Sequence, residues 1–420
     1  MDALIVLSYL SVVLLLGILC SIISHKLRIS NVLLLIIVGI VLNKIQYNGT
    51  RLIQFPAVFL TSMGIFALVM IVFDAASRFK LRDFDKLSSS TIKLSIIFLI
   101  LNLIFLTLFS KIIFSIPSAF LALLFASLMS GTDPAAVISM FGNVKSKVVE
   151  ILKLESLLNT PLIVLLPFII LDLLGSIKTK VSMTNFIDQI MPFLQQFVVG
   201  IGAGILVGII ILKVMKRSYS EFLSPLAIIT AALFTYILAE NLKGNGVLAV
   251  TTMGLFFGNI YVKEKAELIE FSSIFANFLE IVVFILVGLI IEFPMTFSFI
   301  SKSLLLFAIL LIIRLVSVFF SFKDSGLSFK QKMFMTLNVQ KGIAVAAIAF
   351  TLTTYAIKHI TINEGIEVVG SVAFTALPGA MTVLHLTLAF MLYSIILSTA
   401  VIKLSHYFIH TEIKEADKVK

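Results

Sequence analysis

Apolar runs of about 20 residues recur along the whole chain, separated by short polar segments. Each run is long enough to cross the hydrocarbon core of a bilayer as a helix. We predict thirteen such spans, near residues 3–23, 31–42, 57–76, 93–114, 118–141, 149–174, 190–214, 222–239, 246–262, 272–291, 297–320, 332–355 and 377–404. The pattern indicates an all-α polytopic membrane protein. Residues 1–404 would form one transmembrane domain, and residues 405–420 a short cytoplasmic tail.

The composition supports this interpretation and excludes several classes of function. Of 420 residues, 60% are hydrophobic and 13% are charged, whereas soluble domains are about 45–50% apolar. Cys20 is the only cysteine, which rules out an intrachain disulfide and a cysteine-based metal site. The net charge of +10 does not indicate nucleic acid, because no basic run is interleaved with aromatic residues. We expect no enzyme activity and no cofactor, since no catalytic constellation or phosphate-binding loop is visible.

The distribution of basic residues predicts the orientation. The N-terminus has no basic stretch before its apolar run, so we expect the first span to be retained. With thirteen spans, one set of alternate loops is rich in basic residues: Lys26, Arg28, Arg78, Lys80, Arg82, Lys86, Lys145, Lys147, Lys213, Lys216, Arg217, Lys263, Lys265, Lys323, Lys330 and Lys332. The positive-inside rule places these loops in the cytoplasm, the N-terminus outside and the C-terminus inside. The short loops and tail favour the plasma membrane of a prokaryote.

Ionisable residues within the spans are the first candidates for function, because each costs about 2.5–3.5 kcal/mol to insert at the centre of a membrane helix. Six such residues stand out: Asp74, Asp133, Glu155, Glu280, Arg314 and Lys341.

Asp133 lies where the fifth span is expected to break. Pro134 removes a backbone donor and Gly131 weakens the helix just before it. A broken helix in a membrane is tolerated around a cavity or an ion site, and a carboxylate there can bind either a cation or a proton. The alternative is a kinked structural helix in which Asp133 caps the second half.

The twelfth span has a similar interruption at residues 338–342, Asn-Val-Gln-Lys-Gly. If spans one to six and eight to thirteen are two halves, each broken helix is the fifth of its half. Paired interruptions at corresponding positions point to an inverted-repeat transporter. This inference rests on position alone, since the halves show no clear sequence identity.

The sixth span adds a polar face beside the first break. Glu155, Ser156 and Asn159 lie within about one helical turn. We expect Glu155 to pair with Arg314 of span eleven, in a contact that holds two helices in register. The alternative is that Glu155 is simply hydrated near the cytosolic end.

For three other polar residues the sequence allows both a functional and a structural role. Asp74 either faces the ion pathway or forms a helix-end pair with Arg78, four residues later. Glu280 is either a cavity residue or the partner of a buried base. His385 is more in keeping with a packing residue than with a ligand.

These residues together resemble the sodium/proton exchangers of the monovalent cation:proton antiporter-1 family, with its archaeal and bacterial members. Residues 132–137, Thr-Asp-Pro-Ala-Ala-Val, look like the broken-helix motif of the family, and residues 155–159, Glu-Ser-Leu-Leu-Asn, look like the motif of the helix that follows. Weaker matches occur in family order at residues 73–76, 246–250, 254–255, 258–259, 314 and 341–342.

The resemblance implies a fold and a set of roles. It implies thirteen helices in inverted repeats with two broken crossing helices, a homodimer, and electroneutral exchange of sodium, lithium or potassium for protons. Carried over by position, the ion would lie among Thr132, Asp133, Ser156 and Asn159. Glu155 and Arg314 would form a structural ion pair, and Asp74 would line the inner funnel.

One position departs from the family pattern. The family follows Asn159 with an aspartate that binds cation and proton in turn, and here that residue is Thr160. The arginine usual in the twelfth span is replaced by Lys341, which unlike arginine can release its proton when buried. The leading hypothesis is therefore an alternating-access antiporter in which cation and proton compete for Asp133, with Ser156 and Thr160 as neutral ligands. The alternative is a non-exchanging ion sensor or partner subunit of the same fold. A third reading is an exchanger with a different ion preference.

Overall fold

A computed structural model of the chain describes residues 3–27, 31–47, 50–78, 89–132, 147–176, 185–217, 220–261, 264–290, 294–354, 356–363, 366–404 and 407–408. The helices in this part of the chain are α1 (Ala3–Leu27), α2 (Asn31–Lys44), α3 (Ala57–Ser77), α4 (Ser89–Leu101), the π-helical turn η2 (Asn102–Leu106), α5 (Thr107–Phe114), α6 (Ala119–Leu128), α8 (Lys147–Ser176), α9 (Asn185–Arg217), α10 (Leu223–Asn241), α11 (Gly246–Asn259), α12 (Lys265–Ile290), α13 (Phe297–Ser321), α14 (Phe329–Leu337), α15 (Ile343–Thr354), the 3₁₀ turn η3 (Phe374–Ala376) and α16 (Ala380–Lys403).

Each of the thirteen predicted spans contains a helix or a consecutive group of helices, and the part of the fifth span after residue 132 lies outside the described residues. The fourth span is α4, η2 and α5 in sequence, and the twelfth is α14 and α15. In the described part of the chain, eight helical segments are long and apolar enough to cross a membrane, and shorter apolar helices include α2, α6 and α11. The helical, polytopic fold predicted from the apolar pattern is therefore confirmed.

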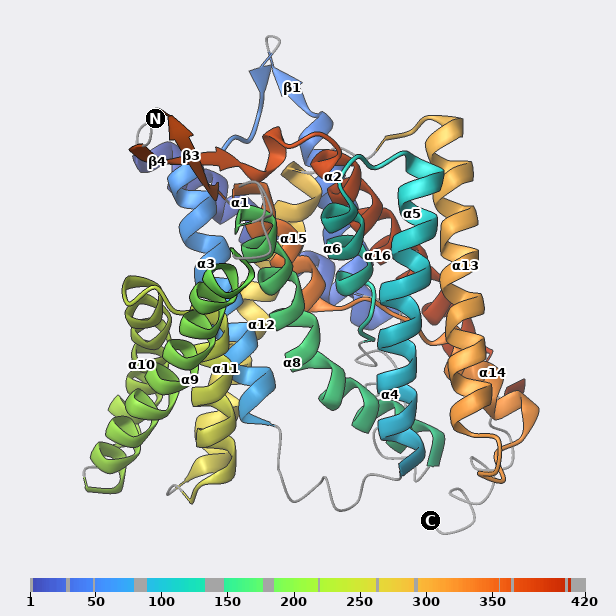
Figure 1. Ribbon diagram of the computed structural model, residues 1–420. Helices are drawn as coiled ribbons and strands as arrows, with labels where there is room; N and C mark the ends of the chain where they lie inside the picture. The colour runs from blue at the N-terminus through green and yellow to red at the C-terminus, as the bar shows by residue number, and fades with distance from the viewer. Residues whose placement is uncertain are drawn as a thin grey trace.

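Two antiparallel hairpins, which the sequence analysis did not predict, lie outside the spans. Strand β1 (Gln46–Tyr47) pairs with β2 (Thr50–Arg51), and β3 (Ala356–Asn363) pairs with β4 (Ile366–Ala373). In the register of the second hairpin, Ala356 is opposite Ala373 and Asn363 is opposite Ile366. Both hairpins extend from the same end of the helix bundle (Figure 1).

The helices form two lateral groups with a shared centre (Figure 1). On one side α9, α10 and α11 pack against one another, and on the other α4 and α14 pack against α13. Between the groups, α15 packs against both α3 and α12. The elements that carry most of the candidate residues, α6, α8, α13 and the α14–α15 pair, therefore belong to the centre and to one lateral group.

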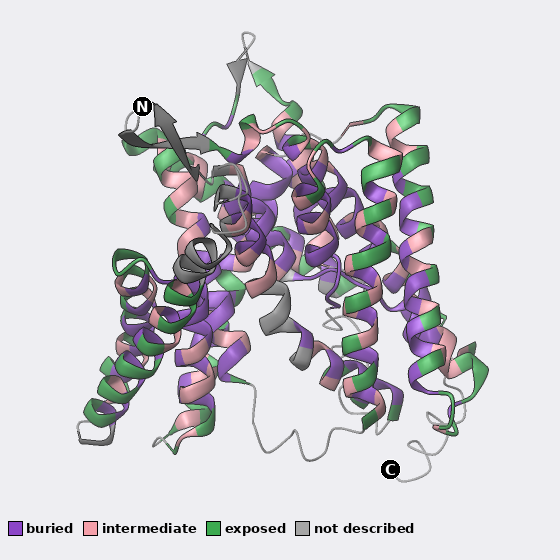
Figure 2. Cartoon of the chain, viewed as in Figure 1, coloured by how far each residue is buried: buried purple, intermediate pink, exposed green. Residues whose placement is uncertain are grey.

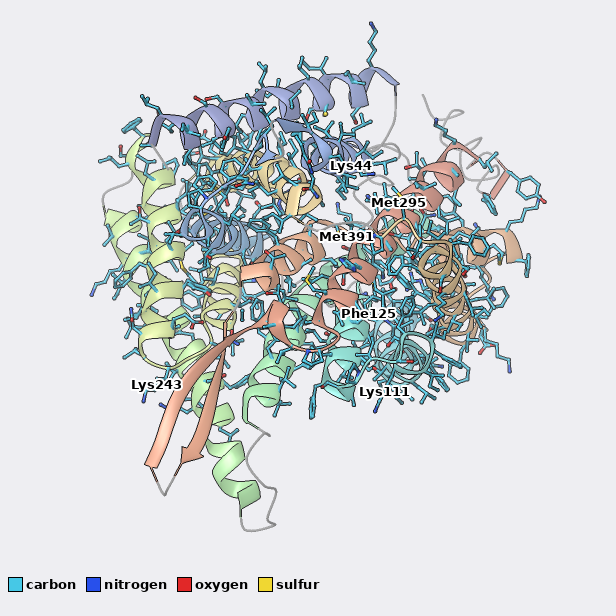
Figure 3. All side chains as sticks on the ribbon, turned by 90° about the horizontal axis from the view of Figure 1, so that it is seen from above. Lys44, Lys111, Phe125, Lys243, Met295 and Met391 are labelled. Carbon is cyan, nitrogen blue, oxygen red and sulfur yellow. The ribbon has the colours of Figure 1, made fainter. Side chains whose placement is uncertain are left out.

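The distribution of exposed residues fits a protein surrounded by lipid (Figure 2). The exposed faces of α1 and α9 carry large apolar side chains, among them Leu15, Ile22 and Ile210. Helices α12 and α16 are the most buried of the long spans. Viewed from above, Phe125 and Met391 lie among the helices, whereas Lys243 lies at the rim (Figure 3). Apolar side chains in water would be unfavourable, so these faces indicate contact with the bilayer.

Helices α2 and α12 cross through a pair of glycines. A Cβ atom on Gly39 would collide with the carbonyl oxygen of Ile285 and lie 2.9 Å from the Cα atom of Gly288. A Cβ atom on Gly288 would in turn lie 2.9 Å from the backbone nitrogen of Ile40. Small residues allow such close backbone approach between membrane helices.

We expect Gly39→Ala to lower the midpoint of thermal unfolding of the purified protein, through a loss of about 1–3 kcal/mol from overpacking. Gly202→Ala is the matched control, because a Cβ atom on Gly202 would meet nothing within 4 Å, and alanine is the better helix former. Differential scanning fluorimetry in detergent measures both variants. Equal midpoints for the two would contradict the close crossing of α2 and α12.

Candidate functional site

The first helix break follows α6. The backbone nitrogen of Met129 still donates to the carbonyl of Phe125, 3.0 Å away, but that of Ser130 donates to Ser127, 3.1 Å away. This tighter last turn leaves the carbonyl of Ala126 without its usual helical donor. Residues 131 and 132 are not helical. The break predicted near Gly131 is therefore present, and the helix ends at Leu128.

The second break separates α14 from α15. Helix α14 begins with a capping box, in which Ser328 and Gln331 satisfy each other's backbone nitrogens, and it ends at Leu337. Residues 338–342 are not helical. The side-chain nitrogen of Asn338 donates to the carbonyl of Phe334 at 2.7 Å, so this break is capped by its own chain segment. The predicted interruption of the twelfth span is confirmed.

Lys341 connects the two breaks. Its ammonium group is fully buried and donates to the carbonyl of Met129 at 2.7 Å and to that of Gly131 at 2.6 Å. The backbone nitrogen of Lys341 donates to the hydroxyl of Ser394 in α16, 3.0 Å away. The carbonyl end of a helix carries a partial negative charge, so a cation is favoured at this position. The end of α6 and the break between α14 and α15 thus meet in the interior.

A buried ion pair lies beside this crossing. The guanidinium of Arg314 in α13 donates through Nη1 to Oε1 of Glu155 and through Nη2 to Oε2, the second at 2.7 Å. Both side chains are fully buried. Asn159, one turn further along α8, donates to Glu155 Oε1 at 3.4 Å. Glu155 is therefore held by a bidentate partner and is not hydrated at a helix end.

Phe98 of α4 covers both buried cations. The centre of its ring is 4.9 Å from Cζ of Arg314 and 5.7 Å from Nζ of Lys341, within the range of cation–π attraction. In the described part of the chain, the charged groups gathered here are Arg314, Lys341 and Glu155, so cations exceed anions by one.

Asp74 takes part in a separate network at the end of α3. Its Oδ2 accepts from Arg78 Nε at 2.9 Å, and its Oδ1 accepts from the hydroxyl of Ser273 in α12 at 2.7 Å. Arg78 Nη2 also donates to Ser273. The helix-end pairing with Arg78 is thus what the structure contains. Among the described residues, no hydrogen bond joins this network to the crossing.

The remaining candidates are only partly described. Asp133 lies outside the described residues, one position after Thr132. Thr160 lies in α8, but its side chain is not among those described. Ser156 follows Glu155 on α8 and is half-buried, and Thr132 is buried. The geometry therefore brings together Thr132, Glu155, Asn159, Arg314 and Lys341.

Asn102, which was not among the residues predicted for the site, is fully buried in η2. Its side-chain nitrogen donates to the carbonyl of Ala126 and to the hydroxyl of Ser130, each at 3.2 Å. The available signal was a lone amide in the middle of an apolar run, since a polar group inside a membrane helix is expensive.

Comparison with known proteins decides the family. The family model described as "sodium/hydrogen exchanger, transmembrane" matches residues 11–404. The chain belongs to the sodium/hydrogen exchanger family. The resemblance inferred from the two motifs is thereby confirmed.

Relatives of this exchanger-family chain are antiporters. It is 25% identical over 381 residues to the probable Na(+)/H(+) antiporter 2 of Methanocaldococcus jannaschii, over 86% of this chain and 87% of the relative. It is 25% identical over 286 residues to the K(+)/H(+) antiporter NhaP of Alkalimonas amylolytica, over 67% of this chain and 49% of that relative. The solved structure of the sodium proton antiporter MjNhaP1 from M. jannaschii at pH 8 superposes with a TM-score of 0.74 at 22% identity, covering 95% of this chain and 100% of the other. The exchanger fold is shared with that structure.

Proposed function

We propose that this chain exchanges a monovalent cation for protons by alternating access, with Asp133 as the carboxylate for which the two compete. The observation that carries the proposal is the meeting of the two helix breaks through Lys341, whose ammonium binds the carbonyls of Met129 and Gly131. Interrupted backbone at the core of a membrane bundle is found where ions bind. Asp133 follows this contact by two residues in the sequence.

The residues around the crossing divide into two roles. Thr132, Ser156, Asn159 and Thr160 would supply neutral oxygen atoms to the cation, because hard cations prefer oxygen ligands. Glu155 and Arg314 would fix α8 against α13 beside the site. The buried ion pair supports this second role, since its two partners come from different helices and leave no charge free between them.

Several finer assignments belong to the same proposal. The cation would be sodium, with lithium or potassium as alternatives, and the relatives include both Na(+)/H(+) and K(+)/H(+) antiporters. Asp74 would line the inner entrance while paired with Arg78. The protein would work as a homodimer in a prokaryotic plasma membrane, with the N-terminus outside and the C-terminus inside, in support of pH homeostasis. The basic loops favour that orientation.

The direct test is a pH-gradient assay with purified protein in liposomes. Sodium, lithium and potassium are added in turn across an acid-to-alkaline range. We expect at least one cation to dissipate the gradient above the rate of protein-free liposomes. No response to any cation, from protein shown to be folded, would reject the antiporter and favour the second candidate.

That second candidate, a non-exchanging ion sensor or partner subunit, is favoured by Thr160. This residue stands where the family carries an aspartate, and threonine cannot exchange a proton at physiological pH. A sensor of this kind would bind the cation without dissipating a pH gradient.

Thr160→Asp separates the two candidates. In an antiporter that uses Asp133, a second carboxylate adds attraction for the cation, and we expect the apparent KM to fall about tenfold, equivalent to about 1.4 kcal/mol. The neutral variant Thr160→Asn is the control and should stay near the wild type. Exchange that appears only in Thr160→Asp would identify the wild type as the non-exchanging form.

A further inference from the structure

The span from Ser89 to Phe114 contains a π-helical turn at its centre. Helix α4 ends at Leu101, η2 covers Asn102–Leu106, and α5 continues from Thr107. A π-helical turn accommodates an extra residue, and such turns are frequent at functional sites. Asn102 is the first residue of this turn and is fully buried.

Asn102 completes the broken end of α6. The carbonyl of Ala126 has lost its backbone donor, because the Ser130 nitrogen bonds to Ser127 instead. Asn102 Nδ2 donates to this carbonyl at 3.2 Å and to Ser130 Oγ, also at 3.2 Å. Ser130 Oγ in turn donates to the carbonyl of Ala126 at 2.8 Å. The last turn of α6 is therefore closed jointly by Ser130 and by a side chain from another span.

The two breaks differ in where the groups that cap their last carbonyls come from. At the end of α14, Asn338 belongs to the interrupted segment itself and caps the carbonyl of Phe334. At the end of α6, the hydroxyl of Ser130 contributes to the carbonyl of Ala126 from the same segment, but further donors come from elsewhere, from Asn102 for Ala126 and from Lys341 for Met129 and Gly131. The position of residues 129–132 thus depends on η2 as well as on Lys341.

Two buried oxygen atoms beside this end are left without a hydrogen bond in the described part of the chain. They are Asn102 Oδ1 and Thr132 Oγ1. An unsatisfied buried acceptor is unfavourable, and natural structures hold few of them outside functional sites. Phe98, one turn before Asn102 on α4, contacts both Arg314 and Lys341. This face of α4 is therefore part of the surroundings of the crossing.

We infer that Asn102 is a positioning residue of the transport site. Through Ala126 and Ser130 it holds the end of α6 in the register that presents residues 131 and 132 to the transported cation. The role toward a transported cation rests on the proposed function, whereas the contact between Asn102 and the end of α6 rests on the structure. Loss of the amide should then weaken the apparent affinity for a cation at this end of α6. The maximal rate of turnover should change less.

The test compares Asn102→Leu, which has similar size and no hydrogen-bonding group, with Ser110→Ala. Ser110 is also fully buried in the same span, but among the described residues its hydroxyl donates to the carbonyl of Thr107 in its own span. In proteoliposomes we expect Asn102→Leu to raise the apparent KM for the cation about tenfold, because one or two hydrogen bonds are lost. The maximal rate should stay within about twofold of the wild type. Ser110→Ala should change neither. An unchanged KM in Asn102→Leu would overturn the inference.

A double-mutant cycle with Ser130→Ala locates the effect. If Asn102 acts through Ser130 and Ala126, the two substitutions are not additive, and the double variant should be little worse than Asn102→Leu alone. Additive changes in KM would show that Asn102 acts by another route. If Asn102→Leu does not fold, Asn102→Ser replaces it with the same measurements.

Hydrogen exchange provides a measurement that needs no transport. In the purified full-length protein, we expect amides in residues 129–132 to exchange faster in Asn102→Leu than in the wild type or Ser110→Ala. A wild type without any cation/proton exchange would reject the proposed function, yet this measurement would still decide whether Asn102 holds α6. Unchanged protection of residues 129–132 would overturn the positioning role.

Discussion

Asp133→Asn is expected to reduce cation/proton exchange to the background rate of protein-free liposomes. Asparagine has nearly the same size as aspartate and keeps one of the two carboxylate oxygen atoms, but it cannot release and rebind a proton at physiological pH. Competition between cation and proton for one carboxylate is the step that couples the two flows in the proposed mechanism. The variant should fold, because only the titrating group is removed.

Asp324→Asn is the control for this substitution. Asp324 is exposed in the turn after α13, and its loss should leave the exchange rate unchanged. The same pH-gradient assay, with thermal unfolding to verify the fold, measures both variants. Full activity in Asp133→Asn would move the proton-carrying role to another carboxylate, Asp74 first.

Arg314→Met is expected to produce the largest loss of stability, about 3–5 kcal/mol. Methionine retains much of the apolar stem but leaves the fully buried Glu155 carboxylate without its bidentate partner. The measurement is the midpoint of thermal unfolding in detergent. The double variant with Glu155→Gln should be more stable than the sum of the single losses predicts, because the isolated charge is then absent.

Arg78→Met is the matched control. Its partner Asp74 lies at a similar distance, but the arginine side chain is 49% exposed, against 0% for Arg314. Exposed pairs contribute about 0–1 kcal/mol, so the loss should be small. Equal losses at the two sites would show that burial does not set the strength of the Glu155–Arg314 pair.

The spans and both breaks could be predicted from the sequence because their causes are local. A run of apolar residues specifies a membrane helix by its length, and Gly131 with Pro134 marks an interruption without reference to any other helix. The pairing of Glu155 with Arg314 could also be predicted, because few charges of opposite sign occur inside the spans. Family motifs then supplied roles that the residue pattern alone left open.

The contacts that close the breaks could not be predicted in this way. The bond from Lys341 to Met129 joins residues 212 positions apart, and no local pattern encodes that meeting. Asn102 was overlooked since one amide in an apolar run gives no sign of what it contacts. The β3–β4 hairpin had a signal, β-branched residues on both sides of residues 363–366. The hairpin lies between two spans, where the pattern of apolar runs carries no information about strands.

The way α6 is capped has a consequence for how the protein is made. Ribosomes add about 5–20 residues per second, so Lys341 is synthesised on the order of 10–40 s after Met129, given their separation of 212 residues. During that interval the carbonyls of Met129 and Gly131 lack the donor that they have in the finished protein, in a solvent that offers no replacement. In a nascent chain that stops before α14, these carbonyls at the end of α6 therefore lack the Lys341 donor within the bilayer. The N-terminal half reaches its final structure only after most of the C-terminal half has been inserted.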